Sequence, residues 1–306
     1  MYSFGSTQIT SAPSAVYLYF AGYIVMRSPL KPCHQEERRN GMPHKDWNPE
    51  QYLQFNRERL QPSIDLVSRI PITHPKTIID VGCGPGNSTQ ILVNRWPESA
   101  VTGIDNSLAM IEHAQRDFPG QTWLLLDAGK DTLPGRWDLI FSNAVLQWIP
   151  DHPALFRTFG RALAPNGCIA VQIPFFFDMP IGKALLKIAH TFGEPTLADV
   201  AGLFTIHTPS VYYDMLSPDF GTVDMWVTDY LHLLQSHEAI LDMVRGAGLR
   251  PYLDRIESPQ RAADFENRVL EAIREAYPAQ HDGRVLFPFK RFFMLLGNAK
   301  QASSTE

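Results

Sequence analysis

The run DVGCGPGNS at residues 80–88 is the clearest structural motif in this sequence. It follows TIIDV at 77–81, whose β-branched residues predict a buried strand, and it leads into a helical segment at 87–96. Its glycines alternate with other residues: Gly82, Gly84 and Gly86. Glycine lets a backbone turn sharply and approach a ligand closely. The G-x-G-x-G spacing differs from the G-x-G-x-x-G of dinucleotide-binding loops, and the Gly-Lys-Ser/Thr ending of a Walker loop is absent.

Strands and helices alternate after this loop. Apolar and β-branched runs predict strands at 100–105, 122–127, 137–142 and 168–173. Because helical segments separate them by short connections, they indicate a parallel sheet covered on both faces. Two later runs, 223–234 and 285–296, predict strands that extend this sheet, and helices around them are placed to cover its ligand edge. The sequence thus predicts an α/β fold with a mainly parallel, seven-stranded sheet.

Acidic residues end the second and third predicted strands. Asp105, in GID, lies about 20 residues beyond the glycines, where a carboxylate can accept both ribose hydroxyls of a nucleoside. Asp127 precedes Ala128 and can accept from an exocyclic amine such as adenine N6. By itself, a glycine-rich loop is often only a tight turn, and an aspartate at the end of a strand is often only a helix cap. Together, at successive strand ends, they favour a nucleoside site.

Composition narrows the function classes. The chain has 306 residues, 44% of them hydrophobic, which suits one large domain or one domain with a cap. A net charge of −5 argues against a nucleic-acid partner. Three widely spaced cysteines without a CxxC pair argue against a disulfide framework and against a metal site, and they favour a reducing compartment, the cytoplasm.

Residues 1–45 are predicted to be an N-terminal extension. Its apolar run, 15–26, is too short to cross a bilayer, which takes about 20 residues. Residues 1–14 contain no Lys or Arg, so the charged start of a signal peptide is missing. Translation from Met42 and a targeting or membrane-surface role both remain open.

The run DVGCGPGNST, followed by GID and DA, resembles the class I methyltransferases that bind S-adenosylmethionine. Further stretches are similar to the trans-aconitate 2-methyltransferase family: DWNPEQYLQFNRER at 46–59, RWPES at 95–99, GIDNSLAMI at 103–111, DLIFSNAVLQWIPDH at 138–152 and GLRPYL at 248–253. The similarity covers about residues 46–297. It implies a Rossmann-like methyltransferase domain over 46–300 with a helical cap built from about 175–220 and 235–280. It also implies that a carboxylate of trans-aconitate becomes a monomethyl ester.

The same resemblance implies the residues that hold S-adenosylmethionine. The glycines would line the methionine and ribose, Asp105 would hold the ribose hydroxyls, Asp127 and Ala128 would contact adenine, and Asp80 would orient the loop and reach the amino group through water. The full set is Asp80, Gly82, Gly84, Gly86, Asp105, Asn106, Asp127, Ala128 and Asn143.

A carboxylate with a reference pKa near 4 is already ionised at neutral pH, so its methylation needs no general base. Gln147 and Trp148, after the fourth strand, are neutral donors that could align it, although Trp148 could equally be core. Trp47 and Tyr52 could close over the cofactor as a lid, or simply pack on the sheet.

A tricarboxylate also needs cations. Arg250 in GLRPYL is the first candidate and Arg291 the second, with Tyr212 and Tyr213 as possible hydrogen-bond donors. The alternatives are a solvated arginine and aromatic residues in the core of the cap. The stretch 174–205 is more aromatic than the family pattern leads us to expect.

The leading interpretation is a carboxyl O-methyltransferase acting on trans-aconitate, as a monomer or weak dimer without stable membrane association. The main alternative is a methyltransferase for another small acid. Several cations in the cap would favour a polycarboxylate, and an apolar pocket would favour a lipid-like acid. C- or N-methylation, a binding module without catalysis and a nicotinamide-dependent dehydrogenase are kept as further alternatives; the glycine spacing disfavours the last.

Overall fold

A computed structural model describes residues 56–299 of the chain. The predicted extension at 1–45, with Met42, and the lid residues Trp47 and Tyr52 lie outside the described residues. Within the described part, no helix is long and apolar enough to span a membrane.

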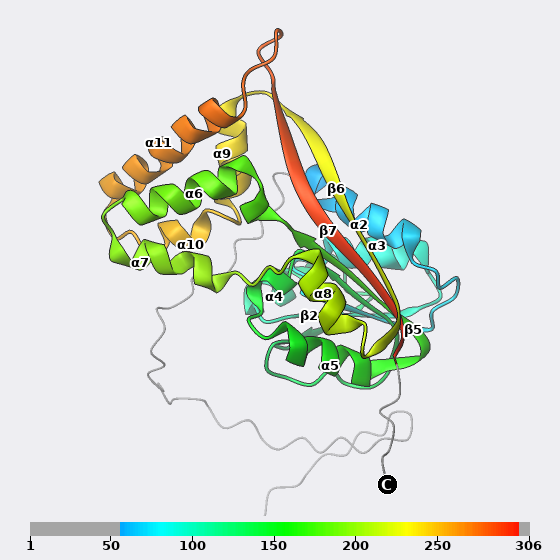
Figure 1. Cartoon of the computed structure of the whole chain (residues 1–306). Coiled ribbons are helices and arrows are strands. Elements are labelled where there is room, and N and C mark those ends of the chain that lie inside the picture. Colours follow the sequence, from blue (N-terminus) through cyan, green and yellow to red (C-terminus); the bar gives the residue numbers. More distant parts are fainter. Residues whose placement is uncertain (1–55, 300–306) are drawn as a thin grey trace, which may run out of the picture. The chain divides into compact units, whose positions relative to one another are not determined.

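A seven-stranded sheet forms the centre of the domain (Figure 1). The strands lie in the order β3-β2-β1-β4-β5-β7-β6. The first five strands in this order are parallel to one another, and β7 runs antiparallel to both β5 and β6. The predicted α/β fold is therefore confirmed. The strand bounds are β1 (Thr77–Val81), β2 (Ala100–Asp105), β3 (Thr122–Leu125), β4 (Trp137–Asn143), β5 (Leu163–Pro174), β6 (Phe220–Leu234) and β7 (Val285–Ala299).

Helices cover both faces because the central strands are apolar on both. On one face α2 (Asn56–Arg69) and α3 (Asn87–Arg95) pack with Phe141 and Phe293 in one core cluster. On the other, α5 (His152–Ala162) and α8 (Pro209–Leu216) pack against Ile79. The helix α4 (Leu108–Asp117) lies against β2 and β3 and begins at Ser107, whose hydroxyl accepts a hydrogen bond from the third following amide.

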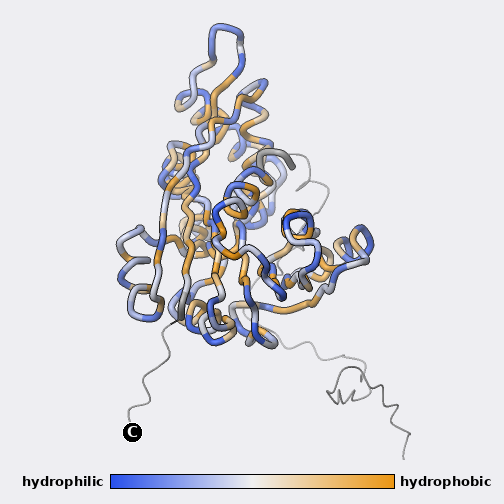
Figure 2. Tube along the Cα trace, turned by 90° about the vertical axis from the view of Figure 1, so that its right-hand side faces the viewer, coloured by the Kyte–Doolittle hydropathy of each residue, from blue (hydrophilic) through white to orange (hydrophobic). Residues whose placement is uncertain are grey.

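A second layer of helices has its own apolar core. It consists of η2 (Phe176–Asp178), α6 (Pro180–Thr191), α7 (Pro195–Ala198), η3 (Asp199–Leu203), α9 (His237–Arg245), α10 (Arg250–Leu253) and α11 (Pro259–Ala276). Val285, Phe287 and Phe289 of β7 belong to this core, so the strand that crosses the sheet also supports the cap. Figure 2 shows the hydrophobic residues along the central strands and a hydrophilic loop ahead of β7.

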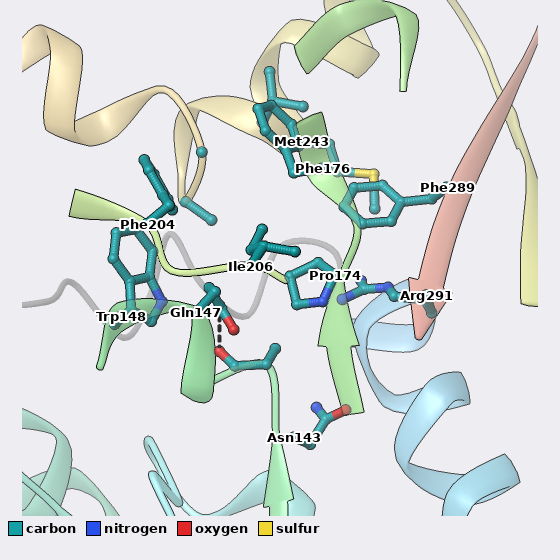
Figure 3. A pocket seen from close by; sticks show the side chains of 14 residues that line it. Asn143, Gln147, Trp148, Pro174, Phe176, Phe204, Ile206, Met243, Phe289 and Arg291 are labelled. Atoms are coloured by element: carbon teal, nitrogen blue, oxygen red, sulfur yellow. Dashed lines mark hydrogen bonds between the residues drawn. The ribbon is translucent and has the colours of Figure 1, made fainter. Parts of the chain in front are cut away.

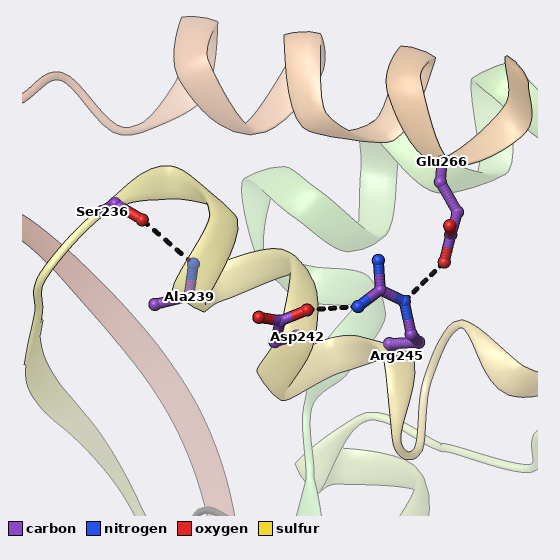
Figure 4. A network of polar contacts seen from close by, with 5 residues as sticks. All are labelled: Ser236, Ala239, Asp242, Arg245 and Glu266. Atoms are coloured by element: carbon purple, nitrogen blue, oxygen red, sulfur yellow. Dashed lines mark hydrogen bonds and ion pairs between the residues drawn. The ribbon is translucent and has the colours of Figure 1, made fainter. Parts of the chain in front are cut away.

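Polar contacts fix the cap helices to one another (Figure 4). Arg245, in the last turn of α9, donates to Glu266 of α11 at 2.5 Å and also pairs with Asp242. Ser236 caps the start of α9 by accepting from the Ala239 amide at 3.3 Å. The cap is thus held together by its own core and by these contacts between helices.

Candidate active site

The loop between β1 and α3 takes a conformation that favours glycine. Gly82 and Gly84 have φ angles of 72° and 55°, in the left-handed region. A β-carbon on Gly82 would overlap Val145, whereas a β-carbon on Gly84 would meet no described atom within 4 Å apart from those of its chain neighbours. The amide of Gly82 donates to the Ile104 carbonyl at 2.7 Å, which fixes the loop to β2. The backbone at Gly84 is therefore open to close approach by a ligand.

Asp80 lies beneath this loop and is fully buried. One of its oxygens, Oδ2, accepts from the Ser88 hydroxyl at 2.8 Å and from the Thr89 hydroxyl at 2.7 Å. The other, Oδ1, has no hydrogen-bond partner among the described residues. Burial raises the pKa of Asp80 to about 6; the two hydroxyls oppose this shift and the nearby charge of Asp105 adds to it. A buried carboxylate oxygen without a partner suits a cationic group or a bridging water.

Asp105 ends β2 beside the loop. Its Oδ2 accepts from the Gly84 amide at 2.9 Å, and its Oδ1 accepts from the Ser107 amide at 2.9 Å. A carboxylate at the end of this strand, beside the glycine loop, is of the kind that accepts hydrogen bonds from ribose hydroxyls. Asn106, the next residue, is exposed.

Asp127 follows β3 and closes its own turn. It accepts from the Gly129 amide at 3.0 Å and pairs with Lys130. Ala128 packs on the edge of the core. These contacts are those of an aspartate that caps a turn, which was the alternative interpretation. Adenine contact by Asp127 and Ala128 stays a prediction.

A pocket lies at the carboxyl ends of β4 and β5 and beside the middle of β7, under the cap (Figure 3). The short helix η1 (Leu146–Trp148) and the end of β4 form one side, and segments of the cap form the other. The Trp148 and Phe204 rings lie 4.6 Å apart, and the Thr205 amide donates to the Gln147 carbonyl at 2.8 Å. The lining residues are Asn143, Ala144, Gln147, Trp148, Pro174, Phe176, Phe204, Ile206, Met243, Val244, Ala247, Gly248, Phe289 and Arg291.

Buried amides lie on the sheet side of the pocket. Gln147 donates through Nε2 to the Ala144 carbonyl at 2.7 Å, as Figure 3 shows, and its Oε1 has no partner within the described part of the chain. The same holds for Oδ1 of Asn143. Ala144 has a φ of 58°, an unfavourable value for a residue with a β-carbon, and such strain is concentrated at functional sites.

Arg291 brings a positive charge into this pocket. It is 6% exposed and is the one charged residue among the described lining residues. Its guanidinium lies 4.2 Å from the centre of the Phe289 ring and donates to Oε1 of Gln172 at 3.5 Å. Gln172 is fully buried and was not predicted as a site residue. In the sequence, Gln172 stands out as a single amide side chain within the apolar strand CIAVQIP at 168–174.

The structure brings together Asn143, Gln147, Trp148 and Arg291, but it places the other predicted substrate residues elsewhere. Arg250 pairs with Asp254 at 3.6 Å in α10, and the described pocket lining does not include it. Tyr212 is fully buried in the core, and Tyr213 is 52% exposed on α8. Substrate contact by these three residues stays a prediction, whereas Arg291 lines the described pocket.

The core position of Tyr212 has its own consequence for the site. Its hydroxyl donates to Nδ1 of His152 at 2.9 Å, and Nε2 of His152 donates to the Leu146 carbonyl at 2.8 Å. Burial lowers the pKa of His152, which favours this neutral form. The pair therefore fixes the turn that carries Gln147, and neither residue was predicted to do so.

A family profile described as a methyltransferase domain matches residues 52–252. A trans-aconitate 2-methyltransferase from Methylobacterium nodulans is 42% identical, over 82% of this chain and 97% of that protein. One from Afipia carboxidovorans is 39% identical, over 82% and 98%. The chain belongs to the trans-aconitate 2-methyltransferase family.

A solved structure agrees with this membership at the level of the fold. The YcgJ protein of Bacillus subtilis superimposes with a TM-score of 0.53 at 13% identity, over 78% of this chain and 99% of that chain. The family profile covers the glycine loop, η1 and part of the cap, and it ends before Phe289 and Arg291 of β7.

Proposed function

We propose that this protein transfers the methyl group of S-adenosylmethionine to a carboxylate of trans-aconitate or a close relative. The observation that carries the proposal is Arg291, a buried cation placed beside Gln147 at the edge of the sheet where the glycine loop also lies. Relatives named for this reaction share about two fifths of the sequence, which supports the same substrate here.

The residues at the glycine loop fit S-adenosylmethionine. The open backbone at Gly84 admits the ligand, and the Asp105 carboxylate, held beside the loop by the Gly84 amide, suits ribose hydroxyls. The buried Oδ1 of Asp80, which has no partner in the described structure, suits the ammonium of the methionine part, directly or through water. When bound, S-adenosylmethionine supplies a methyl group that passes from sulfur to a carboxylate oxygen, leaving S-adenosylhomocysteine and a methyl ester.

The chain's own residues then have positional tasks. The acceptor oxygen uses a lone pair to form the new bond while the carbon–sulfur pair stays on sulfur, so no proton has to move. Arg291 would hold a second carboxylate through its planar fork. Gln147 and Trp148 would position the reacting carboxylate, and the Trp148–Phe204 contact would exclude water. Holding the reacting atoms in line can contribute about 7–11 kcal/mol to the lowering of the barrier.

The test is production of the monomethyl ester and S-adenosylhomocysteine in equal amounts from trans-aconitate. Arg291→Met should lower kcat/KM for the acid about 10- to 100-fold, because a charge-assisted bond is lost, while S-adenosylmethionine binds as before. Lys290→Met is the matched control, since Lys290 is the neighbouring cation, pairs with Asp178 and is not part of the described pocket lining. Equal losses in both variants would contradict the assignment of Arg291.

Cellular setting and assembly are part of the same proposal. Cys83 and Cys168 are buried thiols without a disulfide, which is consistent with a reducing compartment, and we propose the cytoplasm. We also propose that the protein acts as a monomer or weak dimer and without nucleic acid.

A further inference from the structure

Gln172 lies behind the acceptor pocket, outside the described lining. It is fully buried on β5, between β4 and β7, and its register partners on those strands are Asn143 and Phe293. Its oxygen Oε1 accepts a hydrogen bond from Nη1 of Arg291 at 3.5 Å. The side chain of Gln172 therefore reaches the pocket through Arg291.

The backbone of Gln172 supports the opposite side of the same pocket. Its carbonyl accepts from the Ala144 amide at 2.9 Å, and the Ala144 carbonyl accepts from Nε2 of Gln147 at 2.7 Å. Hydrogen bonds thus connect Gln147, through Ala144 and Gln172, to Arg291. Because the proposed function places the reacting carboxylate at Gln147 and a second one at Arg291, these contacts set the separation between the two partners of the acid.

Two printed contacts orient the Arg291 side chain. The guanidinium carbon lies 4.2 Å from the centre of the Phe289 ring, and Gln172 accepts from one guanidinium nitrogen. Arginine has several rotatable bonds, so fixing its planar fork before an acid binds lowers the entropic cost of binding. Glutamine is uncharged, so its contact orients the guanidinium without neutralising it.

We propose that Gln172 is a positioning residue, which fixes the Arg291 guanidinium and so sets where the second carboxylate of the acceptor binds. This inference rests on the proposed function, because it concerns the same acceptor site. It assigns Gln172 no contact with the acid, so the whole effect of its amide on the reaction passes through Arg291.

A double-mutant cycle tests whether the effect of Gln172 depends on Arg291. The kcat/KM for trans-aconitate is measured with saturating S-adenosylmethionine for the wild type, Gln172→Met, Arg291→Met and the double variant. Methionine has a similar length and lacks the amide. Gln172→Met should lower kcat/KM about tenfold when Arg291 is present and less than twofold when Arg291→Met is already in place. A tenfold loss in both backgrounds, or no loss in either, would overturn the proposal.

Further variants separate positioning from folding. Thr102 is a buried polar residue on β2 outside the described lining, and Thr102→Val should leave kcat/KM within twofold of the wild type. Gln172→Asn keeps a buried amide that is one methylene shorter, and it should reproduce the pattern of Gln172→Met in the same cycle. The Kd for S-adenosylmethionine is measured for every variant, and Gln172→Asn replaces Gln172→Met if the latter does not bind it.

The outcomes separate this inference from the function on which it rests. Ester formation by the wild type, with equal losses from Gln172→Met in both backgrounds, contradicts the inference and keeps the proposed function. No ester from the wild type contradicts the proposed function. The Kd for trans-aconitate in the presence of S-adenosylhomocysteine then provides the same cycle without turnover: a loss that depends on Arg291 supports the positioning role, and equal losses overturn it.

Discussion

At the scale of single residues, Asp80 combines burial with an incomplete set of hydrogen bonds. Its pKa is raised to about 6, chiefly by burial. In the unfolded chain the carboxyl titrates near 3.9, so the folded protein binds this proton more tightly. The resulting stabilisation is fully present below the unfolded pKa and is lost as the pH rises through the folded pKa.

Asp80→Asn should remove this dependence, because asparagine does not titrate. From about pH 4 to pH 7, the free energy of unfolding of the wild type should fall relative to that of Asp80→Asn by about 2 kcal/mol. Urea denaturation of both proteins at several pH values without ligand measures it. Parallel pH curves for the two proteins would show that Asp80 does not titrate in this way.

Asp105 should contribute to cofactor binding through charge. Asp105→Ala should raise the Kd for S-adenosylmethionine about 100-fold, since hydrogen bonds to charged groups contribute about 1.5–3 kcal/mol each. Titration calorimetry measures this, with Asp117→Ala as control because Asp117 is an exposed carboxylate at the end of α4. An unchanged Kd for Asp105→Ala would remove the ribose assignment.

At the scale of elements, α5, α8 and the η1 turn are joined through one buried pair. Tyr212 of α8 donates to His152 at the start of α5, and His152 donates to η1. Because both ring nitrogens of His152 are used, removing one partner leaves a buried polar atom unsatisfied.

Tyr212→Phe should therefore lower the free energy of unfolding by about 1–3 kcal/mol. Tyr213→Phe is its matched control: the neighbouring ring is 52% exposed, and a surface change there should cost less than about 0.5 kcal/mol. Chemical denaturation of both variants at neutral pH measures the two free energies of unfolding. Equal losses would show that the buried Tyr212–His152 pair has no structural role.

The bounds of some helices and strands could be predicted from the sequence, and those of others could not. The bounds predicted for β1 and β2 agree with the structure, because turn residues mark the ends of each. The short elements α7, η3 and α10 were not predicted, since three to five residues carry no hydrophobic period.

Site residues were predictable where the backbone alone places them. Gly84 and Asp105 follow directly from strand ends and lie together as expected. The positions of Tyr212 and Arg250 depend on which face of a short helix is buried, and that of Gln172 depends on a neighbour on another strand, Arg291. Such facts are set by tertiary packing and are not contained in a local pattern.

At the scale of the whole described domain, the 15-residue strands β6 and β7 connect the sheet to the cap. Phe293 belongs to the core beneath α2, and Phe287 of the same strand belongs to the cap core. The two cores share a continuous strand, so we expect them to unfold together.

Thermal unfolding should then show a single transition, and S-adenosylhomocysteine should raise the Tm of that whole transition. S-adenosylhomocysteine at 100 times its Kd should stabilise the folded state by about 2.7 kcal/mol, which corresponds to a rise in Tm of about 5–10 °C. Calorimetry measures both. Two transitions, of which the ligand shifts only the first, would mean that cap and sheet unfold separately.

The central claim is methyl transfer to a carboxylate at the pocket beside Arg291. Its most direct test uses S-adenosylmethionine with a deuterated methyl group and trans-aconitate, with mass spectrometry of the products over time. The account predicts a monomethyl ester that carries the deuterated methyl group, formed in step with S-adenosylhomocysteine and strongly reduced in Arg291→Met. Binding of S-adenosylmethionine without any labelled ester would contradict it.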